Sequence, residues 1–383
     1  MKNISKFIIV FILLAQPVLA DEVEEGLRAL KRGDFKTAFE NWKPLAEKGN
    51  STAQFNLGLM YDKGDGVRQN FPKAVKWYRL AAKQKNVSAQ FNLGLMYYNG
   101  EGVARNYEKA LKWFLYAARQ GNIGAQYNLG WMFDKGEGTT PNYKRAIKWY
   151  RLAAKKGNSG AQYNLGLMYD KGERVSRDFD KALRWYLKAG NLGNAEAQLK
   201  LAHIYDRGND EVKKDHQKAI RWYKLSAKQG EIEAQLRLAK IYEKGSLVEK
   251  NFEYAVKWYE AAAKKESLEA QSRLGTFYMY GKGVRKNFTK AVYWLQKAAK
   301  RGDAKAQFNL GLLYERGDGV SKNHRKAVKW YLMAAEQDHA KAQANLGWMY
   351  VNGMGVEEDL DEAAKWYKRS ESLGKYPEKK LFN

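Results

Sequence analysis

The sequence predicts an all-α protein, a right-handed α/α superhelix (solenoid) of about nine 36-residue helical hairpins that follow one N-terminal hairpin. Two observations predict this fold. The dipeptide Ala-Gln recurs every 36 residues from Ala53 to Ala342, with a single interval of 37. Within each interval, apolar residues recur at helical spacing on both sides of a glycine. A fixed period of this length is typical of stacked hairpins that share one continuous core.

Each repeat divides into two helices, A and B, when its positions are numbered from Ser51 in the first repeat. Positions 3, 4, 7, 8, 10 and 11 form the apolar arc of helix A, which ends at a glycine at position 14, such as Gly64. An Asn or Asp at position 20, such as Asn70, caps helix B. The nine repeats begin at Ser51, Val87, Ile123, Ser159, Ala195, Ile232, Leu268, Ala304 and Ala340.

Two positions should control packing between the helices. A Trp recurs at position 27 of helix B, and Trp42 opens the series. Because a buried indole removes a large apolar area from water, we expect these rings to lie in the core. The Gly at position 8 should let the helices approach closely.

The two ends of the chain differ from the array. Residues 1–20 place Lys2 and Lys6 around the start of a short apolar run, which predicts a signal peptide cleaved near Ala20. Residues 21–50 are expected to form a divergent N-terminal hairpin, 51–375 the nine repeats, and 376–383 a C-terminal tail. No later stretch is apolar enough to span a membrane. We therefore expect a periplasmic or secreted protein, with the lumen of the endoplasmic reticulum as the alternative.

The composition argues against several kinds of chemistry. The 383 residues include no Cys, and the four His residues lie in different repeats without the spacing of metal ligands. Nucleophile motifs are missing, and the glycine loops follow helices instead of strands. We expect no enzyme activity, no catalytic residue, no metal and no cofactor. The net charge of +26 is also typical of proteins that bind nucleic acid, but export argues against that partner.

The strings AxAQYNLGLMY, GxGV, K-A-[VLI]-K-W-Y and A-A-K-x-G-N resemble the Sel-one-like repeat (SLR), a relative of the tetratricopeptide repeat, across nearly all of 51–375. The resemblance implies a scaffold or adaptor, which in bacteria is often exported. Some cysteine-rich members are classed as β-lactamase-like or penicillin-binding proteins. This chain cannot form their disulfides, so that activity ranks behind two binding functions.

These two functions use opposite faces of the array. In the first, a non-catalytic scaffold or adaptor of the cell envelope holds a partner's peptide or helix in a concave groove. In the second, a structural envelope protein binds an anionic polysaccharide or a membrane surface through a basic convex face made by helix B.

The resemblance to tetratricopeptide arrays places positions 5, 6 and 9 of helix A in the groove. We expect Lys200, Arg237 and Arg273, with His203 and Lys240 beside them, to accept an acidic segment or a C-terminus. Alternatively, the Asn row bonds neighbouring backbone and the aromatic residues pack between hairpins. The predicted groove also contains Asn56, Asn92, Asn128, Asn164, Asn309 and Asn345 at position 6, and Phe55, Phe91, Tyr127, Trp131, Tyr163 and Trp348 at positions 5 and 9.

Overall fold

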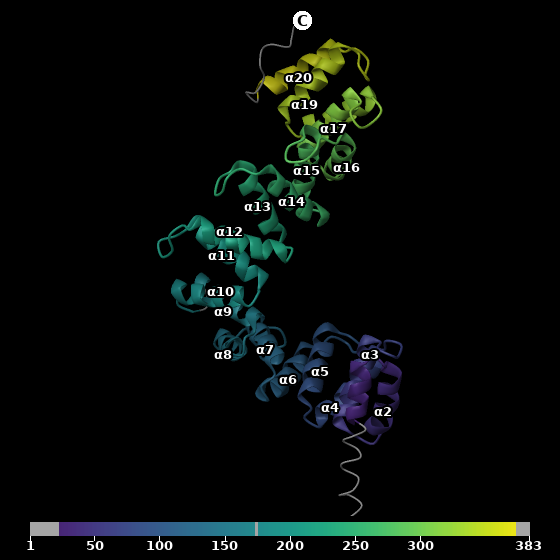
Figure 1. Ribbon diagram of the computed structural model, residues 1–383, viewed down its shortest axis with the longest axis vertical. Helices are drawn as coiled ribbons and strands as arrows, with labels where there is room; N and C mark the ends of the chain where they lie inside the picture. The colour runs from purple at the N-terminus through teal and green to yellow at the C-terminus, as the bar shows by residue number, and fades with distance from the viewer. Residues whose placement is uncertain (1–22, 173–174, 373–383) are drawn as a thin grey trace, which may run out of the picture. The chain divides into compact units, whose positions relative to one another are not determined.

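The computed structural model describes residues 23–172 and 175–372, and all regular structure in these ranges is helical (Figure 1). The predicted signal peptide and C-terminal tail lie outside the described residues. Contacts divide the chain into two units, an N-terminal half, 1–194, and a C-terminal half, 195–383. None of the described helices combines the length and the apolar character needed to cross a membrane.

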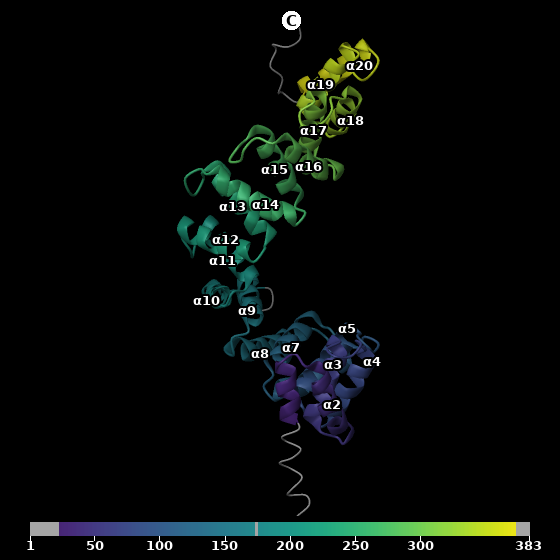
Figure 2. The same ribbon diagram turned by 45° about the vertical axis from the view of Figure 1, so that its right-hand side comes forward.

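The helices follow one another as hairpins of nearly constant length (Figure 2). In the N-terminal half, helical residues 23–31 precede α2 (Phe35–Glu47), α3 (Ser51–Lys63), α4 (Phe71–Lys83), α5 (Val87–Asn99), α6 (Tyr107–Arg119), α7 (Ile123–Lys135), α8 (Tyr143–Lys155), α9 (Ser159–Lys171) and α10 (Phe179–Asn191). The C-terminal half contains α11 (Ala195–Arg207), α12 (His216–Lys228), α13 (Ile232–Lys244), α14 (Phe252–Lys264), α15 (Leu268–Tyr280), α16 (Phe288–Lys300), α17 (Ala304–Arg316), α18 (His324–Ala335), α19 (Ala340–Val351) and α20 (Leu360–Ser372). The odd-numbered helices from α3 are helices A, and the even-numbered ones from α4 are helices B.

The predicted caps set the helix ends. The Asn70 side chain accepts a hydrogen bond from the Lys73 backbone N–H at the start of α4. Gly64 ends α3 with a φ of 82°, a left-handed conformation that favours glycine. Helix A begins at a second cap, because Asn50 accepts a hydrogen bond from the Ala53 N–H. The two caps and the glycine therefore confirm the helix boundaries expected from the repeat.

The core aromatic residue of helix B is at position 28, one residue after the Trp that we expected there. The position 28 side chains Tyr78, Phe114, Tyr150, Tyr186, Tyr223, Tyr259, Leu295 and Tyr331 are at most 1% exposed. At position 27, seven of the nine Trp rings are only half-buried, and the exceptions are Trp222 and Trp366. The expectation of a buried Trp was therefore wrong for most repeats, because one residue turns a helix by about 100°.

Trp42 is fully buried for a different reason from the one expected. Asp34 caps α2, so Trp42 falls at position 28 of that helix and not at position 27. Gly58 at position 8 makes room for the equivalent Tyr78, since a Cβ there would lie 2.5 Å from the Tyr78 ring. The glycine at position 8 therefore lets helix A approach helix B closely, as predicted, and the side chain that it contacts is the ring at position 28.

A row of buried glutamines at position 4 joins neighbouring hairpins, and we call it the glutamine seam. In the eight members other than Gln198, Nε2 donates to a backbone carbonyl near the end of the preceding helix, as from Gln90 to Ala82 at 3.2 Å and from Gln343 to Ala335 at 3.0 Å. Each of these carbonyls also accepts a backbone N–H from the turn after its helix, as Ala82 does from Lys85 at 3.0 Å, so the glutamine is a second donor to it. The seam comprises Gln54, Gln90, Gln126, Gln162, Gln198, Gln235, Gln271, Gln307 and Gln343, all of which are buried.

A second glutamine, at position 34, completes the seam in some repeats. Gln84 donates to Gln54 Oε1 at 2.9 Å and to the carbonyl of Gly49 at 2.9 Å. Lys156 stands at this position in repeat 3, where it reaches the Gly121 carbonyl at 2.9 Å. The Oε1 atom of Gln126 consequently accepts no hydrogen bond from the described residues.

Replacing Lys156 with Gln should stabilise the protein. The new side chain can keep the bond to the Gly121 carbonyl and also satisfy the buried oxygen of Gln126. We expect the free energy of unfolding to rise by about 1 kcal/mol in urea denaturation. Lys155→Gln makes the same charge change at an exposed neighbour and should have little effect. An unchanged or lower stability for Lys156→Gln would contradict this account of the seam.

Candidate functional site: the helix A face

The helix A face consists of positions 5, 6, 9, 12 and 13 of the helices A, and every predicted groove residue lies on it. Five position 5 rings, those of Phe55, Phe91, Tyr127, Tyr163 and Phe308, pack against the position 28 ring of their own repeat, with centroids 5.8–6.0 Å apart. These aromatics therefore support the hairpin as well as line the face. The alternative interpretation placed this packing between hairpins, whereas these contacts lie within one hairpin.

Each buried tyrosine at position 28 reaches the helix A face with its hydroxyl. Tyr78 donates to Asp62 at 3.1 Å, and Tyr259 donates to Glu243 at 2.5 Å. The same bond joins Tyr186 to Asp170, Tyr223 to Asp206 and Tyr331 to Glu315. In repeats 2 and 7, Phe114 and Leu295 replace the tyrosine, and position 12 is then Tyr98 or Met279 instead of an acid. In repeats 1 to 8, position 12 is therefore an acid wherever position 28 is a tyrosine.

Position 6 of the following repeat joins the same cluster. Asn164 Nδ2 donates to Tyr150 Oη at 3.1 Å. Arg237 donates to Asp206 Oδ2 from Nε at 3.0 Å and from Nη2 at 2.7 Å. Arg273 Nη1 lies 3.4 Å from Glu243 Oε1. The position 6 side chains therefore connect consecutive hairpins, through the amides of Asn164 and Asn309 and through the ion pairs of the two arginines.

The predicted acid-binding cluster of the C-terminal half already contains carboxylates of the same chain. Besides the two arginine pairs, Lys240 Nζ lies 2.8 Å from Glu269 Oε1, and His203 Nε2 lies 3.2 Å from Glu233 Oε1. Burial lowers the pKa of His203, so its ring is neutral near pH 7. An incoming acidic segment would have to displace these partners, which sequence spacing within one helix does not reveal.

In the N-terminal half, the predicted residues Trp131, Tyr163 and Asn164 line one pocket between α7 and α9. Its volume is about 300 Å³, and its remaining walls are Asp134, Lys135, Tyr150, Leu167, Met168 and Lys171. The Lys135 ammonium lies 4.9 Å from the centroid of the Trp131 ring. The pocket thus offers apolar surface, an amide and cations to one ligand.

Sequence reasoning missed the two lysines of this pocket. Lys135 and Lys171 occupy position 13, four residues after Trp131 and Leu167 at position 9. Residues four apart lie on the same side of a helix, so this spacing could have placed the lysines beside the aromatic ring.

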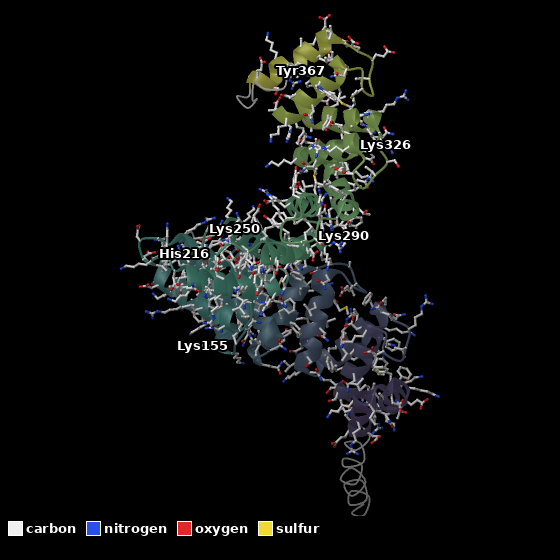
Figure 3. All side chains as sticks on the ribbon, turned by 45° about the horizontal axis from the view of Figure 1, so that its top comes forward. Lys155, His216, Lys250, Lys290, Lys326 and Tyr367 are labelled. Carbon is white, nitrogen blue, oxygen red and sulfur yellow. The ribbon has the colours of Figure 1, made fainter. Side chains whose placement is uncertain are left out.

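Helix B presents a different surface, whose cations partly support the fold. At position 23, Lys73, Lys290 and Lys326 lie over the tyrosine at position 11, with ammonium-to-centroid distances of 5.1, 5.1 and 5.3 Å. Lys290 and Lys326 are labelled in Figure 3. These pairs have the geometry of cation–π interactions. Among the described residues, no group of three or more His, Asp or Glu side chains is arranged to hold a metal ion.

Comparison with known proteins identifies the repeat. The family model described as the Sel1 repeat matches residues 51–86, 87–122, 123–158, 159–194, 195–231, 232–267, 268–303, 304–339 and 340–375. The chain is 37% identical, over 94% of its length, to a protective antigen of uropathogenic Escherichia coli strains that displays an SLR fold, and it covers 78% of that protein with a TM-score of 0.65. It is 36% identical, over 63% of its length, to a Sel1 repeat protein from Oxalobacter formigenes, of which it covers 99% with a TM-score of 0.59. A comparison with curated protein sequences finds no match.

Reversing the charge of Arg237 should destabilise the protein. The Asp206 side chain is only 7% exposed, and Arg237→Glu would place a second carboxylate beside it. Because Arg237 itself is partly exposed, we expect a loss of roughly 1–3 kcal/mol in urea denaturation. Arg237→Asn should cost less, since Asn occupies this position in other repeats. Equal stability of Arg237→Glu and the parent protein would show that the pair contributes nothing.

Alkaline pH should destabilise the protein through its hydrogen-bonded tyrosines. Burial and the bond to Glu137 raise the pKa of Tyr98 to about 12, and burial and the bond to Glu260 do the same for Tyr278. The unfolded chain therefore binds fewer protons than the folded one above about pH 10, and the free energy of unfolding falls as the pH rises from 10 to 12. Tyr98→Phe should make this fall shallower in urea denaturation. Tyr293→Phe, the same change at an exposed tyrosine, should leave the fall unaltered. If the free energy of unfolding fell equally steeply with pH in both variants, Tyr98 would not be a source of the alkaline destabilisation.

Proposed function

The chain belongs to the Sel1 repeat family, and on that premise we propose that it is a scaffold of the cell envelope that holds a partner's peptide or helix on its helix A face. Repeats of this family form non-catalytic scaffolds that generally mediate protein interactions. The envelope location is supported by the predicted signal peptide at residues 1–20.

The observation that carries this proposal is the pocket between α7 and α9. Small sites of this kind combine apolar walls with a few polar groups that orient the ligand. Trp131, Tyr163 and Leu167 supply apolar contact area, and Asn164 supplies an amide that can pair with peptide backbone. Lys135 and Lys171 add positive charge at the same pocket. An apolar side chain of the partner would enter the pocket, while its backbone or a carboxylate would bond the polar groups.

The pocket also distinguishes two tryptophans that share position 9. Trp131 lies on α7, and the following helix A, α9, supplies the other wall. Trp348 is 39% exposed on α19, which is the last helix A in the described residues. We therefore place the anchor of the partner at Trp131 and treat Trp348 as its matched control.

Truncation of Trp131 should abolish capture of the partner. The reference chain carries a photocrosslinking amino acid in place of Leu167 and is otherwise unchanged. On irradiation in cells it should form one adduct with a partner protein. Trp131→Ala should reduce this adduct at least tenfold, as loss of an aromatic anchor does. The melting temperature should change little because Trp131 is only half-buried.

Trp348→Ala should leave the same adduct intact. An adduct that persists in Trp131→Ala, or that is lost equally in both variants, would move the binding site away from the pocket between α7 and α9.

A further inference from the structure

A second pocket lies on the helix B side of the N-terminal half and is not used by the function proposed above. Its volume is about 750 Å³. One wall is α8, which contributes Lys144, Lys148, Arg151 and Lys155. Successive members of this row are four, three and four residues apart, so they follow one side of the helix for about 16 Å. Lys155, at the end of the row, is labelled in Figure 3.

Among the lining residues, α8 contributes four cations, and there is one acid, Asp178, that could pair with them. The Asp178 carboxylate is already 2.6 Å from Lys181 Nζ. Arg151 donates to the Tyr169 hydroxyl at 2.5 Å. Lys144, Lys148 and Lys155 are exposed, and none of them forms an ion pair or hydrogen bond with the described residues. These three lysines are therefore available to an anionic ligand.

The apolar lining of this pocket, which we call its floor, consists of Ile147, Leu152, Tyr169 and Val175. Ile147 is 8% exposed and Tyr169 is 7% exposed, while Leu152 is 37% exposed. Val175, from the segment before α10, is half-buried and completes the floor. A ligand must therefore bring apolar groups into a hollow and negative charges to its rim.

The same helix positions in other repeats do not combine these features. The row occupies positions 22, 26, 29 and 33, and among the described helices α8 alone has a cation at all four. In α6 the first and third of these positions are Glu108 and Leu115, and in α14 they are Glu253 and Glu260. The charge row is thus a property of this one repeat, beyond the general basicity of the chain.

We propose that this pocket binds an acidic segment of a partner protein, with aliphatic side chains on the apolar floor and carboxylates on Lys144, Lys148 and Lys155. A flat membrane surface fits less well, because Ile147 and Tyr169 are buried and Leu152 alone is exposed enough to insert into a bilayer. A uronate polysaccharide supplies the charge but has no aliphatic side chains for Leu152 and Val175. An acidic protein segment matches both the rim and the floor.

The test is fluorescence anisotropy of a labelled synthetic peptide built from repeated Glu-Glu-Leu, titrated with the full chain at physiological salt. Lys148→Glu combined with Lys155→Glu should weaken binding at least tenfold. Lys112→Glu combined with Arg119→Glu makes the same charge change at the same positions of α6 and should weaken it less than threefold. Equal weakening by both pairs would show attraction to the net positive charge only, and would overturn the proposal.

The contribution of the apolar floor is tested by a second variant and its control. Leu152→Gln should weaken peptide binding at least fivefold, whereas Leu80→Gln, at the equivalent position of α4 and also 37% exposed, should not change it. Polyglutamate, polygalacturonate and phosphatidylglycerol vesicles serve as competitors without leucine. If any of them competes as strongly as the unlabelled peptide, charge alone accounts for binding and the proposal fails.

This test is independent of the helix A face. Trp131→Ala should leave binding of the acidic peptide unchanged, so failure of one proposal does not imply failure of the other. Melting curves of the four variants should match that of the natural chain, because all the altered side chains are exposed. Loss of binding in Trp131→Ala would place the peptide on the helix A face and overturn the assignment to α8.

Discussion

The hydrogen bond from the position 4 glutamine to the preceding hairpin is the contact on which the rest of the array depends. A helical hairpin cannot cover its own apolar arc, so its stability comes from its neighbours. The last carbonyls of each helix B accept backbone N–H groups of the following turn, as Ala82 does from Lys85, and the next hairpin packs against the same carbonyls. Gln90 adds a second donor to the Ala82 carbonyl from inside the core, where its own buried amide would otherwise lack a partner, at a cost in free energy. The seam thereby links the end of one hairpin to the start of the next.

This link determines which side chains meet on the helix A face. With the start of helix A held against the preceding helix B, position 6 lies beside the hydroxyl of the preceding position 28 tyrosine, as Asn164 does beside Tyr150. The cations at position 6 consequently meet the carboxylates that accept from those tyrosines. Arg237 and Arg273 therefore neutralise Asp206 and Glu243, so much of their positive charge is used within the fold.

The period, the caps and the closing glycines could be predicted from sequence because each depends on contacts within one helix or one loop. The buried aromatic was misplaced because positions 27 and 28 are both aromatic in most repeats, and periodicity alone does not choose between neighbours. The ion pair between Arg237 and Asp206 was missed because its members are 31 residues apart in different repeats. The α7–α9 pocket was found in part, since Trp131, Tyr163 and Asn164 could be placed on one face from rotation alone.

Repetition then explains where binding sites can arise. A side chain that recurs in every repeat, such as the glutamine at position 4, serves contacts that every hairpin must make. A site for one partner needs residues that break this regularity without disturbing those contacts. Trp131 does so at position 9, where the next repeat has Leu167, and Lys144 does so at position 22, where the preceding repeat has Glu108. Both changes occur in repeat 3, one on helix A and one on helix B. This hairpin therefore departs from the repeat on both of its faces, while Gln126 keeps the seam bond to the Ala118 carbonyl.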